Sequence, residues 1–354
     1  MEVAAVLDAI SGIRTVVVGE AMLDVYVEGA GRRLCQEAPV PVVAVARRAE
    51  GPGGAANVAA NVAALGAHAS CLSVVGDDSE GRLLRESLDR AGVETGHLVC
   101  EPGRRTLTKH RVVAAGQMLV RFDQGDVDPP RTDSQQALVE RLNRAFAECE
   151  LVIVSDYGYG ILTPRVIAAL AALQSQSPRF VVVDSKNLGA YRGVGVAAVK
   201  PNRFQAARLL GMNGDDAAAV NADTLLSREA DLYGATGASI VAVTLDSDGA
   251  IVFQRGGSPC RTTARPSSGL RAIGAGDTYV AALGLALAAG ADPSTASRIA
   301  SAAAEVVTRK EGTAVCLREE LCDELLPRRT LGSELIYVPK KPARDSDAGD
   351  CPTW

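Results

Sequence analysis

The sequence feature that most restricts the fold is an alternation of short valine-rich runs with longer runs rich in alanine and leucine. The valine-rich runs are apolar throughout, which is typical of strands buried on both faces. Strands that alternate with helices predict a parallel sheet with helices on both sides, and therefore an α/β fold. The predicted strands lie at residues 15–19, 70–76, 151–155, 180–184, 196–200 and 239–244, and the predicted helices at residues 55–65, 80–91, 164–173 and 278–289.

Two segments, at about residues 24–46 and 104–123, interrupt this alternation. Their β-branched residues follow a near alternation typical of strands with one open face. We expect them to form a small sheet that projects from the main domain as a lid or a dimer contact; an antiparallel edge of the main sheet is the alternative. The main domain is expected at residues 1–330. Proline, lysine and aspartate are frequent at the end of the chain, where residues 331–354 are expected to be a flexible tail.

Composition argues against several classes of partner. The net charge is −5, from 37 basic and 42 acidic residues, and no basic stripe contains interleaved aromatic residues, so nucleic-acid binding is not expected. The eight cysteines are scattered without a CxxC pair, which favours reduced thiols over a zinc site. The acidic N-terminus lacks the basic region of a signal peptide, and the longest uncharged apolar run, at 279–291, is too short to span a membrane. We therefore expect a cytoplasmic protein without a membrane partner.

The stretch Gly274-Ala275-Gly276-Asp277 directly precedes a strongly apolar predicted helix. Glycines at this position let backbone N–H groups converge on an anion, and the helix dipole adds positive potential. Phosphoryl transfer needs such a site because charge builds up on the equatorial oxygens of the transferred group. Asp277 is placed to accept a proton from an attacking hydroxyl. For these four residues alone, an ordinary turn with Asp277 as a helix cap is an equal alternative.

A second glycine-rich stretch covers residues 51–57. Its glycines permit a ligand to approach the backbone closely, and Asn57 offers both a donor and an acceptor. Asp24 follows the first predicted strand and is expected at a strand end. A carboxylate and an amide in such places suit a ligand with many hydroxyl groups, although turn chemistry and helix capping are the alternative.

The predicted lid carries charged side chains, namely Lys109, Arg111, Arg121 and Asp123. Lys109 and Arg111 share one strand face, where two cations suit a phosphate on the substrate. A solvated strand face is the alternative. The chain has no GxxxxGK[ST] motif, which excludes a P-loop enzyme, and the protease, hydrolase and protein-kinase motifs HExxH, GxSxG and HRD are also missing.

Together the two glycine-rich stretches resemble the signatures of the PfkB/ribokinase family of sugar kinases, in the same order and about 220 residues apart. The resemblance covers about residues 15–325. It implies a ribokinase-like three-layer α/β/α domain with a mostly parallel sheet and a small β lid, and ATP and Mg²⁺ as cofactors. It also implies that Asp277 is the base and that Gly274, Ala275 and Gly276 form the anion hole.

Within this family, the chain is most similar to the bacterial heptose-7-phosphate kinases. The motifs that carry this similarity are at residues 19–24, 37–42, 53–59, 107–112, 121–123 and 155–157. The similarity implies transfer of the γ-phosphate of ATP to the anomeric hydroxyl of a heptose 7-phosphate, giving a 1,7-bisphosphate for ADP-heptose synthesis. It also implies a sugar phosphate as the small-molecule partner. Many such kinases are fused to an adenylyltransferase; the sequence ends too early for one, so we expect the kinase-only form. The projecting lid, with its exposed strand edges, separately favours a homodimer through the lid.

The resemblance assigns further site residues. Substrate-binding roles are implied for Asp24, Gly53, Gly54, Asn57, Lys109, Arg111, Arg121, Asp123 and Asp156. Nucleotide-binding roles are implied for Lys186, Asn202, Thr244, Asp246, Gly249 and Gly276, with Mg²⁺ near Asn202 and Gln205.

Three motifs depart from the family pattern, at four positions. Gln205 replaces a glutamate that helps to organise Mg²⁺ and its water shell, Arg271 and Ile273 replace an aspartate and a threonine at a monovalent-cation site, and Tyr159 replaces a lysine. These departures leave two alternatives open: a kinase for another sugar or sugar phosphate, and a sugar-phosphate-binding protein with weakened catalysis.

Overall fold

The computed structural model describes residues 2–212, 217, 220–264 and 273–326. The predicted tail at 331–354 and Arg271 lie outside these residues. Within them, no helix is both long and apolar enough to cross a membrane.

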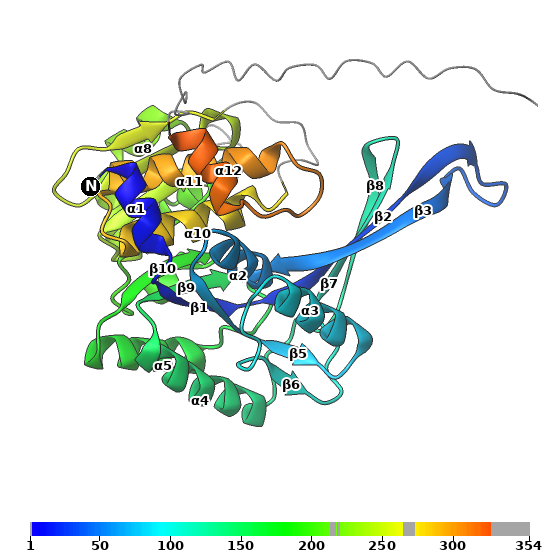
Figure 1. Cartoon of the computed structure of the whole chain (residues 1–354), viewed down its shortest axis with the longest axis horizontal. Coiled ribbons are helices and arrows are strands. Elements are labelled where there is room, and N and C mark those ends of the chain that lie inside the picture. The colour runs from blue at the N-terminus through cyan, green and yellow to red at the C-terminus, as the bar shows by residue number, and fades with distance from the viewer. Residues whose placement is uncertain (1, 213–216, 218–219, 265–272, 327–354) are drawn as a thin grey trace, which may run out of the picture.

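The main body is an eight-stranded sheet in the order β14-β13-β12-β11-β10-β9-β1-β4, with helices on both faces (Figure 1). The six strands from β12 to β4 are parallel, because each pairs with its neighbour in the same direction. β13 and β14 extend the sheet with antiparallel pairing. The strands are β1 (Arg14–Gly19), β4 (His68–Leu72), β9 (Leu151–Asp156), β10 (Phe180–Ser185), β11 (Ala198–Val199), β12 (Ile240–Thr244), β13 (Ala250–Gln254) and β14 (Cys260–Thr262).

The two faces of the sheet bury different side chains of the same strands. In β9, Leu151 and Ile153 belong to one hydrophobic core, whereas Val152 and Val154 belong to the other, because successive side chains of a strand point to opposite faces. The first core is covered by α1 (Val3–Ile10), α2 (Ala55–Ala64), α3 (Ser79–Arg90), α10 (Ala275–Ala288), α11 (Pro293–Thr308) and α12 (Arg318–Leu325). The second is covered by α4 (Thr132–Glu148), α5 (Pro164–Gln176), α6 (Arg203–Leu209), α8 (Ala222–Ser227) and α9 (Glu229–Thr236). This arrangement confirms the predicted three-layer α/β/α fold.

A separate four-stranded sheet projects from the body (Figure 1). Its order is β3-β2-β7-β8, from β2 (Ala21–Leu34), β3 (Pro41–Gly54), β7 (Thr108–Ala114) and β8 (Gln117–Gln124). The predicted projecting lid is therefore confirmed. The antiparallel edge of the main sheet is made by β13 and β14, which were not predicted. The predicted strand at 70–76 is two short strands, because β5 (Val74–Gly76) leaves the main sheet to pair with β6 (Val99–Glu101).

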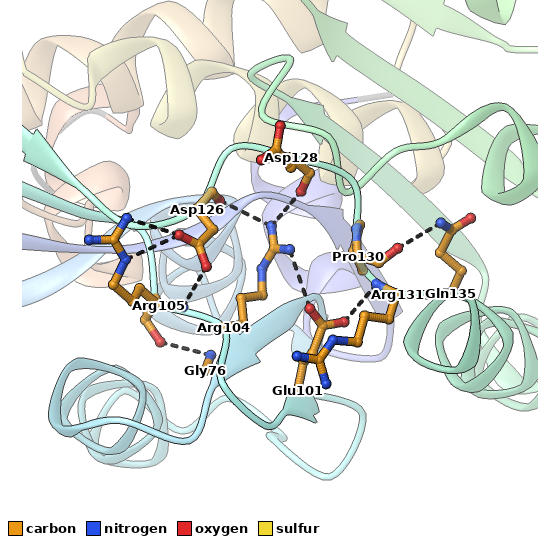
Figure 2. Close-up of polar contacts among 10 residues, drawn as sticks. Gly76, Glu101, Arg104, Arg105, Asp126, Asp128, Pro130, Arg131 and Gln135 are labelled. Carbon is orange, nitrogen blue, oxygen red and sulfur yellow. Dashed lines mark hydrogen bonds and ion pairs between the residues drawn. The ribbon is translucent and has the colours of Figure 1, made fainter.

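Buried Arg104 joins the chain entering lid strand β7 to the chain leaving lid strand β8 (Figure 2). Its Nη2 donates to the backbone oxygens of Asp126 at 3.1 Å and Asp128 at 3.0 Å, and its Nη1 lies 3.6 Å from a carboxylate oxygen of Glu101. Arg105 adds a bond from its backbone N–H to the Asp126 carboxylate at 3.0 Å. Since a buried charge is costly unless it is paired and hydrogen-bonded, these contacts fix both connections at the base of the lid.

Candidate active site

Polar side chains gather where the parallel strands end. Glu20 follows β1, Tyr157 follows β9, Lys186 follows β10 and Lys200 follows β11, while Thr244 is the last residue of β12. In open α/β sheets, ligands bind in the crevice outside the carboxyl ends of the strands. The base of the lid and the start of α10 meet at this same edge.

Asp277 lies in the first turn of α10, where two side chains from other elements hold its carboxylate. Its Oδ2 accepts a hydrogen bond from Asn57 Nδ2 of α2 at 2.8 Å, and its Oδ1 accepts one from Tyr157 Oη at 2.7 Å. The residue that caps α10 is Gly274, with a φ of 84° in the left-handed region. Asp277 is thus not the helix cap of the alternative interpretation, and its carboxylate is directed at side chains.

Burial raises the pKa of Asp277 to about 6, because the carboxylate has lost most of its hydration. The hydrogen bonds from Asn57 and Tyr157 lower the pKa, Asp184 raises it, and Lys200 lowers it. A pKa of about 6 leaves the carboxylate ionised at neutral pH and brings it near the range in which a general base works well.

Two cavities meet at the start of α10. The larger, of about 540 Å³, is lined by five of the predicted nucleotide-binding residues, Asn202, Thr244, Asp246, Gly249 and Gly276. The smaller, of about 250 Å³, is lined by Asp156, Lys186, Gln205, Gly274 and Asp277, among others. Lys200, Asn202 and Gly276 line both cavities. A phosphate chain that enters from the larger cavity would therefore pass the start of α10 and reach Asp277.

Lys200 places a cation beside this helix start. The side chain is almost fully buried, and Nζ forms an ion pair with Asp184 Oδ2 at 3.0 Å. A Cβ on Gly276 would lie only 3.6 Å from Lys200 Nζ, so the ammonium is close to the backbone of the first turn of α10. Together with the backbone N–H groups and the helix dipole, it makes this point favourable for an anion. Sequence reasoning missed Lys200 and Asp184; the available signal was a charged residue at the end of a buried apolar run.

Asp24 is buried and held from several sides. Arg111 Nη1 lies 2.9 Å from Oδ1, and Thr313 Oγ1 donates to Oδ2 at 2.6 Å. Tyr26 Oη lies 2.8 Å from the same Thr313 hydroxyl. Asp24 is not at a strand end as predicted but is the fourth residue of β2, because the lid strand continues directly from the main body.

The glycines before α2 are also placed differently from the prediction. Gly51–Gly54 are not a turn but the end of β3, opposite the first residues of β2. A Cβ on Gly53 would lie 2.8 Å from the carboxyl carbon of Asp24. This close approach explains the glycine, since any other side chain would displace the Asp24 carboxylate.

The charged lid residues share one face. Asp24 of β2 is opposite Lys109 of β7, and Lys109 is opposite Asp123 of β8. Arg111 is likewise opposite Arg121. Directly opposed residues of neighbouring strands point to the same side of the sheet. Arg121 Nε donates to the exposed Asp123 carboxylate at 2.8 Å. Within the described part of the chain, Lys109 has no ion pair.

Two lysines from different elements lie against a pair of tyrosine rings. Lys109 Nζ is 4.8 Å from the ring centre of Tyr157 and 5.7 Å from that of Tyr159, and Lys186 Nζ is 4.8 Å from the Tyr159 ring centre. Burial lowers the pKa of Lys109. Asp156 at the end of β9 accepts hydrogen bonds from Ser185 Oγ at 2.7 Å and Tyr191 Oη at 2.8 Å. The Asp156 carboxylate therefore already binds side chains at the end of β10 and in the segment that follows it.

The groups proposed for Mg²⁺ form a hydrogen-bonded pair at the start of α6. Asn202 Oδ1 accepts from the Gln205 backbone N–H at 2.9 Å, and Gln205 Oε1 accepts from the Asn202 backbone N–H at 2.7 Å. The described residues contain no group of three or more His, Cys, Asp or Glu side chains able to hold a metal. Mg²⁺ usually keeps several waters and binds through substrate phosphates with few protein ligands, so this edge of the cavity is compatible with it.

Residues 13–320 match the profile described as pfkB family carbohydrate kinase. The chain belongs to this family. Among PfkB-family relatives, it is 39% identical over 316 residues to the "Bifunctional protein HldE" of Caulobacter sp. (strain K31), a match that covers 88% of this chain and 63% of that protein. It is 38% identical over 326 residues to the protein of the same name from Gluconobacter oxydans, covering 92% of this chain and 67% of that protein. The chain therefore spans about two thirds of the length of these relatives.

Solved structures of the family share the fold at lower identity. Phosphofructokinase-2 from Escherichia coli, in complex with substrates and products, has a TM-score of 0.72 at 22% identity, covering 88% of this chain and 98% of that one. Ribokinase from Arabidopsis thaliana, complexed with ribose and ATP, has a TM-score of 0.68 at 21% identity, covering 89% and 99%. These matches agree with the ribokinase-like architecture of the body.

Proposed function

We propose that this protein transfers the γ-phosphate of ATP to the anomeric hydroxyl of a heptose 7-phosphate. The observation that carries the proposal is the place of Asp277. Its ionisable, buried carboxylate lies at the start of α10, where a large cavity lined by the predicted nucleotide-binding residues meets a smaller one.

In the proposed reaction, Asp277 takes the proton of the sugar hydroxyl while the hydroxyl oxygen forms its bond to the γ-phosphorus. The bond from that phosphorus to the ADP oxygen breaks at the same time. Backbone N–H groups of the 274–276 turn and the Lys200 ammonium stabilise the negative charge of the transferred group. Asn202 and Gln205 would lie near Mg²⁺ bound with ATP, and that ion would neutralise charge on the phosphates. Help from a base such as Asp277 is typically worth about 10²- to 10⁴-fold in rate.

The sugar is proposed to bind between the lid and the start of α10. In this arrangement Asp24 and Gly53 would line the sugar site, and the Asp24 carboxylate would accept hydrogen bonds from sugar hydroxyls. Because Arg111 and Arg121 are each paired with a carboxylate, Lys109 is the lid cation best suited to a phosphate on the substrate. It also lines a small cavity of about 80 Å³ with Asp123, Gln124 and Tyr159. The heptose-kinase motifs, together with the similarity to the HldE proteins, support a heptose as the sugar.

We also propose that the lid pairs with the lid of a second copy of the chain. Large apolar side chains are exposed on it, namely Leu34, Val40, Val45, Met118, Leu119, Val120 and Phe122. A projecting sheet with exposed apolar residues is a surface that normally finds a partner. Light scattering of the purified chain tests this point, and a monomer at micromolar concentration would contradict it.

The substrate is tested by offering heptose 7-phosphate, fructose 6-phosphate, fructose 1-phosphate and ribose with Mg-ATP and measuring ADP release. The proposal predicts turnover on heptose 7-phosphate and a new ³¹P resonance from an anomeric phosphate. Turnover only on another sugar would show a different kinase of the same family. Sugar phosphate binding without turnover on the whole panel would favour the binding protein with weakened catalysis.

A further inference from the structure

Tyr157 connects the lid, the end of the central sheet and Asp277. Its phenol O–H donates to Asp277 Oδ1 at 2.7 Å, and its ring lies 4.8 Å from the ammonium of lid residue Lys109. Burial and the nearby Asp277 raise the pKa of Tyr157 well above its usual value. The phenol therefore keeps its proton, and because an ionised carboxylate can only accept, the direction of this hydrogen bond is fixed.

The backbone of Tyr157 is held as firmly as its side chain. Glu20, which is fully buried after β1, accepts a hydrogen bond from the Tyr157 N–H at 2.7 Å and from the Ile161 N–H at 3.1 Å. A carboxylate that binds two N–H groups of one loop restricts the position of that loop. Tyr157 is thus fixed at both ends, at Glu20 through its backbone and at Asp277 through its hydroxyl.

The hydrogen bonds at Asp277 leave a defined space for the substrate. An ionised carboxylate offers about four lone-pair positions, and Asn57 and Tyr157 each occupy one on a different oxygen. The carboxyl plane is therefore set by two donors from two elements, α2 and the loop after β9. A carboxylate with only one of these donors could rotate about its last side-chain bond and would lose the alignment that a proton transfer requires.

We propose that Tyr157 is a positioning residue for the kinase reaction: its hydroxyl fixes the orientation of the Asp277 carboxylate and favours the ionised form that accepts the proton. This inference rests on the proposed role of Asp277 as the base. The other charged groups near the pair are Asp184 and Lys200 at the ends of β10 and β11, Lys186 after β10, and Asp24 and Lys109 of the lid. None of them is removed by changing the Tyr157 hydroxyl.

The test is Tyr157→Phe, which removes the hydroxyl and keeps the ring and the backbone N–H that Glu20 holds. The matched control is Tyr159→Phe, two residues away in the same loop, whose ring also contacts Lys109 but whose hydroxyl makes no hydrogen bond to Asp277. The pKa of Asp277 is measured by ¹³C NMR of carboxyl-labelled aspartate in the enzyme without substrate, and Asp277→Asn assigns the resonance. The pH dependence of kcat is measured on heptose 7-phosphate, or on the best sugar of the panel.

Tyr157→Phe is expected to raise the Asp277 pKa by about one to two units, because a hydrogen bond to the charged form is lost. The acid limb of the kcat profile should move in the same direction. At pH 7 the smaller ionised fraction of Asp277 alone lowers kcat about twofold to tenfold. A further loss of kcat that persists at pH 9, where the carboxylate is ionised, reports a change in its orientation. KM for ATP should stay unchanged in Tyr157→Phe. In Tyr159→Phe the Asp277 pKa and the position of the acid limb on the pH axis should stay at their wild-type values, whatever the height of the profile.

Two results separate this inference from the proposed function. If Asp277→Asn abolishes turnover but Tyr157→Phe leaves the Asp277 pKa and the acid limb at their wild-type positions, the positioning role is wrong and the base role stands. If Asp277→Asn turns over like wild type, the base role is wrong. The NMR pKa then still decides whether Tyr157 holds the carboxylate, since a value that stays at about 6 in Tyr157→Phe would refute that contact as well.

Discussion

The Asp277→Asn substitution should increase the free energy of unfolding at pH 8, although it replaces the residue that we assign as the base. The physical reason is the burial of the carboxylate, which is only 8% exposed. Its pKa is raised from 3.8 in the reference state to about 6 in the folded chain. The folded chain therefore binds this proton more tightly than the unfolded chain, and an ionised Asp277 costs stability.

The magnitude follows from the shift. Raising the pKa by about two units costs about 3 kcal/mol of stability when the carboxylate is ionised, at about 1.4 kcal/mol per unit. Because the pKa of this acid is higher in the folded chain than in the unfolded chain, its ionisation lowers the free energy of unfolding. This cost is absent below about pH 4, grows as the pH rises through 6, and is constant at higher pH. At pH 5 about half of it should be present. In the variant, the introduced side-chain amide can accept from Asn57 and donate to the Tyr157 hydroxyl, so both partners keep a hydrogen bond.

The assay is urea denaturation of the nucleotide-free chain at pH 8 and pH 5, with m-values compared to confirm two-state behaviour. We expect a gain of up to about 3 kcal/mol at pH 8 and a clearly smaller gain at pH 5. Asp133→Asn, on the exposed first turn of α4, is the control and should change stability by no more than about 0.5 kcal/mol. A variant that is less stable than wild type at pH 8, or a gain independent of pH, would show that the ionised Asp277 carboxylate does not cost stability.

Three further predictions concern residues around this centre. Arg111→Met leaves the buried Asp24 carboxylate without its ion-pair partner and should cost about 3–5 kcal/mol in urea denaturation; adding Asp24→Asn should recover more than half of that loss, and no recovery would contradict the pairing. Gly274→Ala forces a side chain into the left-handed region, with a Cβ 2.8 Å from a buried amide nitrogen. It should therefore cost more than Gly256→Ala, which has a φ of 78° but open space around it, and equal thermal shifts would argue against the contact. Gln205→Glu should keep the hydrogen bond that the side chain accepts from the Asn202 N–H and lower the Mg²⁺ concentration needed for half-maximal rate. An unchanged Mg²⁺ titration would show that residue 205 does not take part in Mg²⁺ binding.

The sequence predicted the features that depend on local patterns. The parallel strands are continuous apolar runs, such as the one at 151–154, and the buried helix after Gly274 is a long apolar run in which Asp277 is the only charged residue. The lid was visible because its residues alternate where the rest of the chain does not. β14 escaped prediction because a three-residue strand with an arginine at its centre, Arg261, has no measurable period.

Contacts between residues far apart in the chain were beyond local patterns. Tyr157 lies 120 positions from Asp277, and nothing near either residue in the sequence indicates the hydrogen bond between them. Asp24 was expected at a strand end, but its neighbours in the fold are Arg111 and Thr313, 289 positions away in the latter case. Among Lys109, Arg111 and Arg121, which share one lid face, Lys109 has no ion pair in the described structure. The pairing of Arg111 with Asp24 likewise depends on the register between β2 and β7.

The most direct test of the central claim is the turnover of Asp277→Asn on the best sugar substrate of the panel, with nucleotide and sugar phosphate binding measured by calorimetry on the same protein. If Asp277 is the base, kcat falls by at least about 10²-fold while both dissociation constants stay within about threefold of wild type. A rate close to that of wild type, or a loss explained by weaker binding alone, would contradict the assignment of Asp277 as the base.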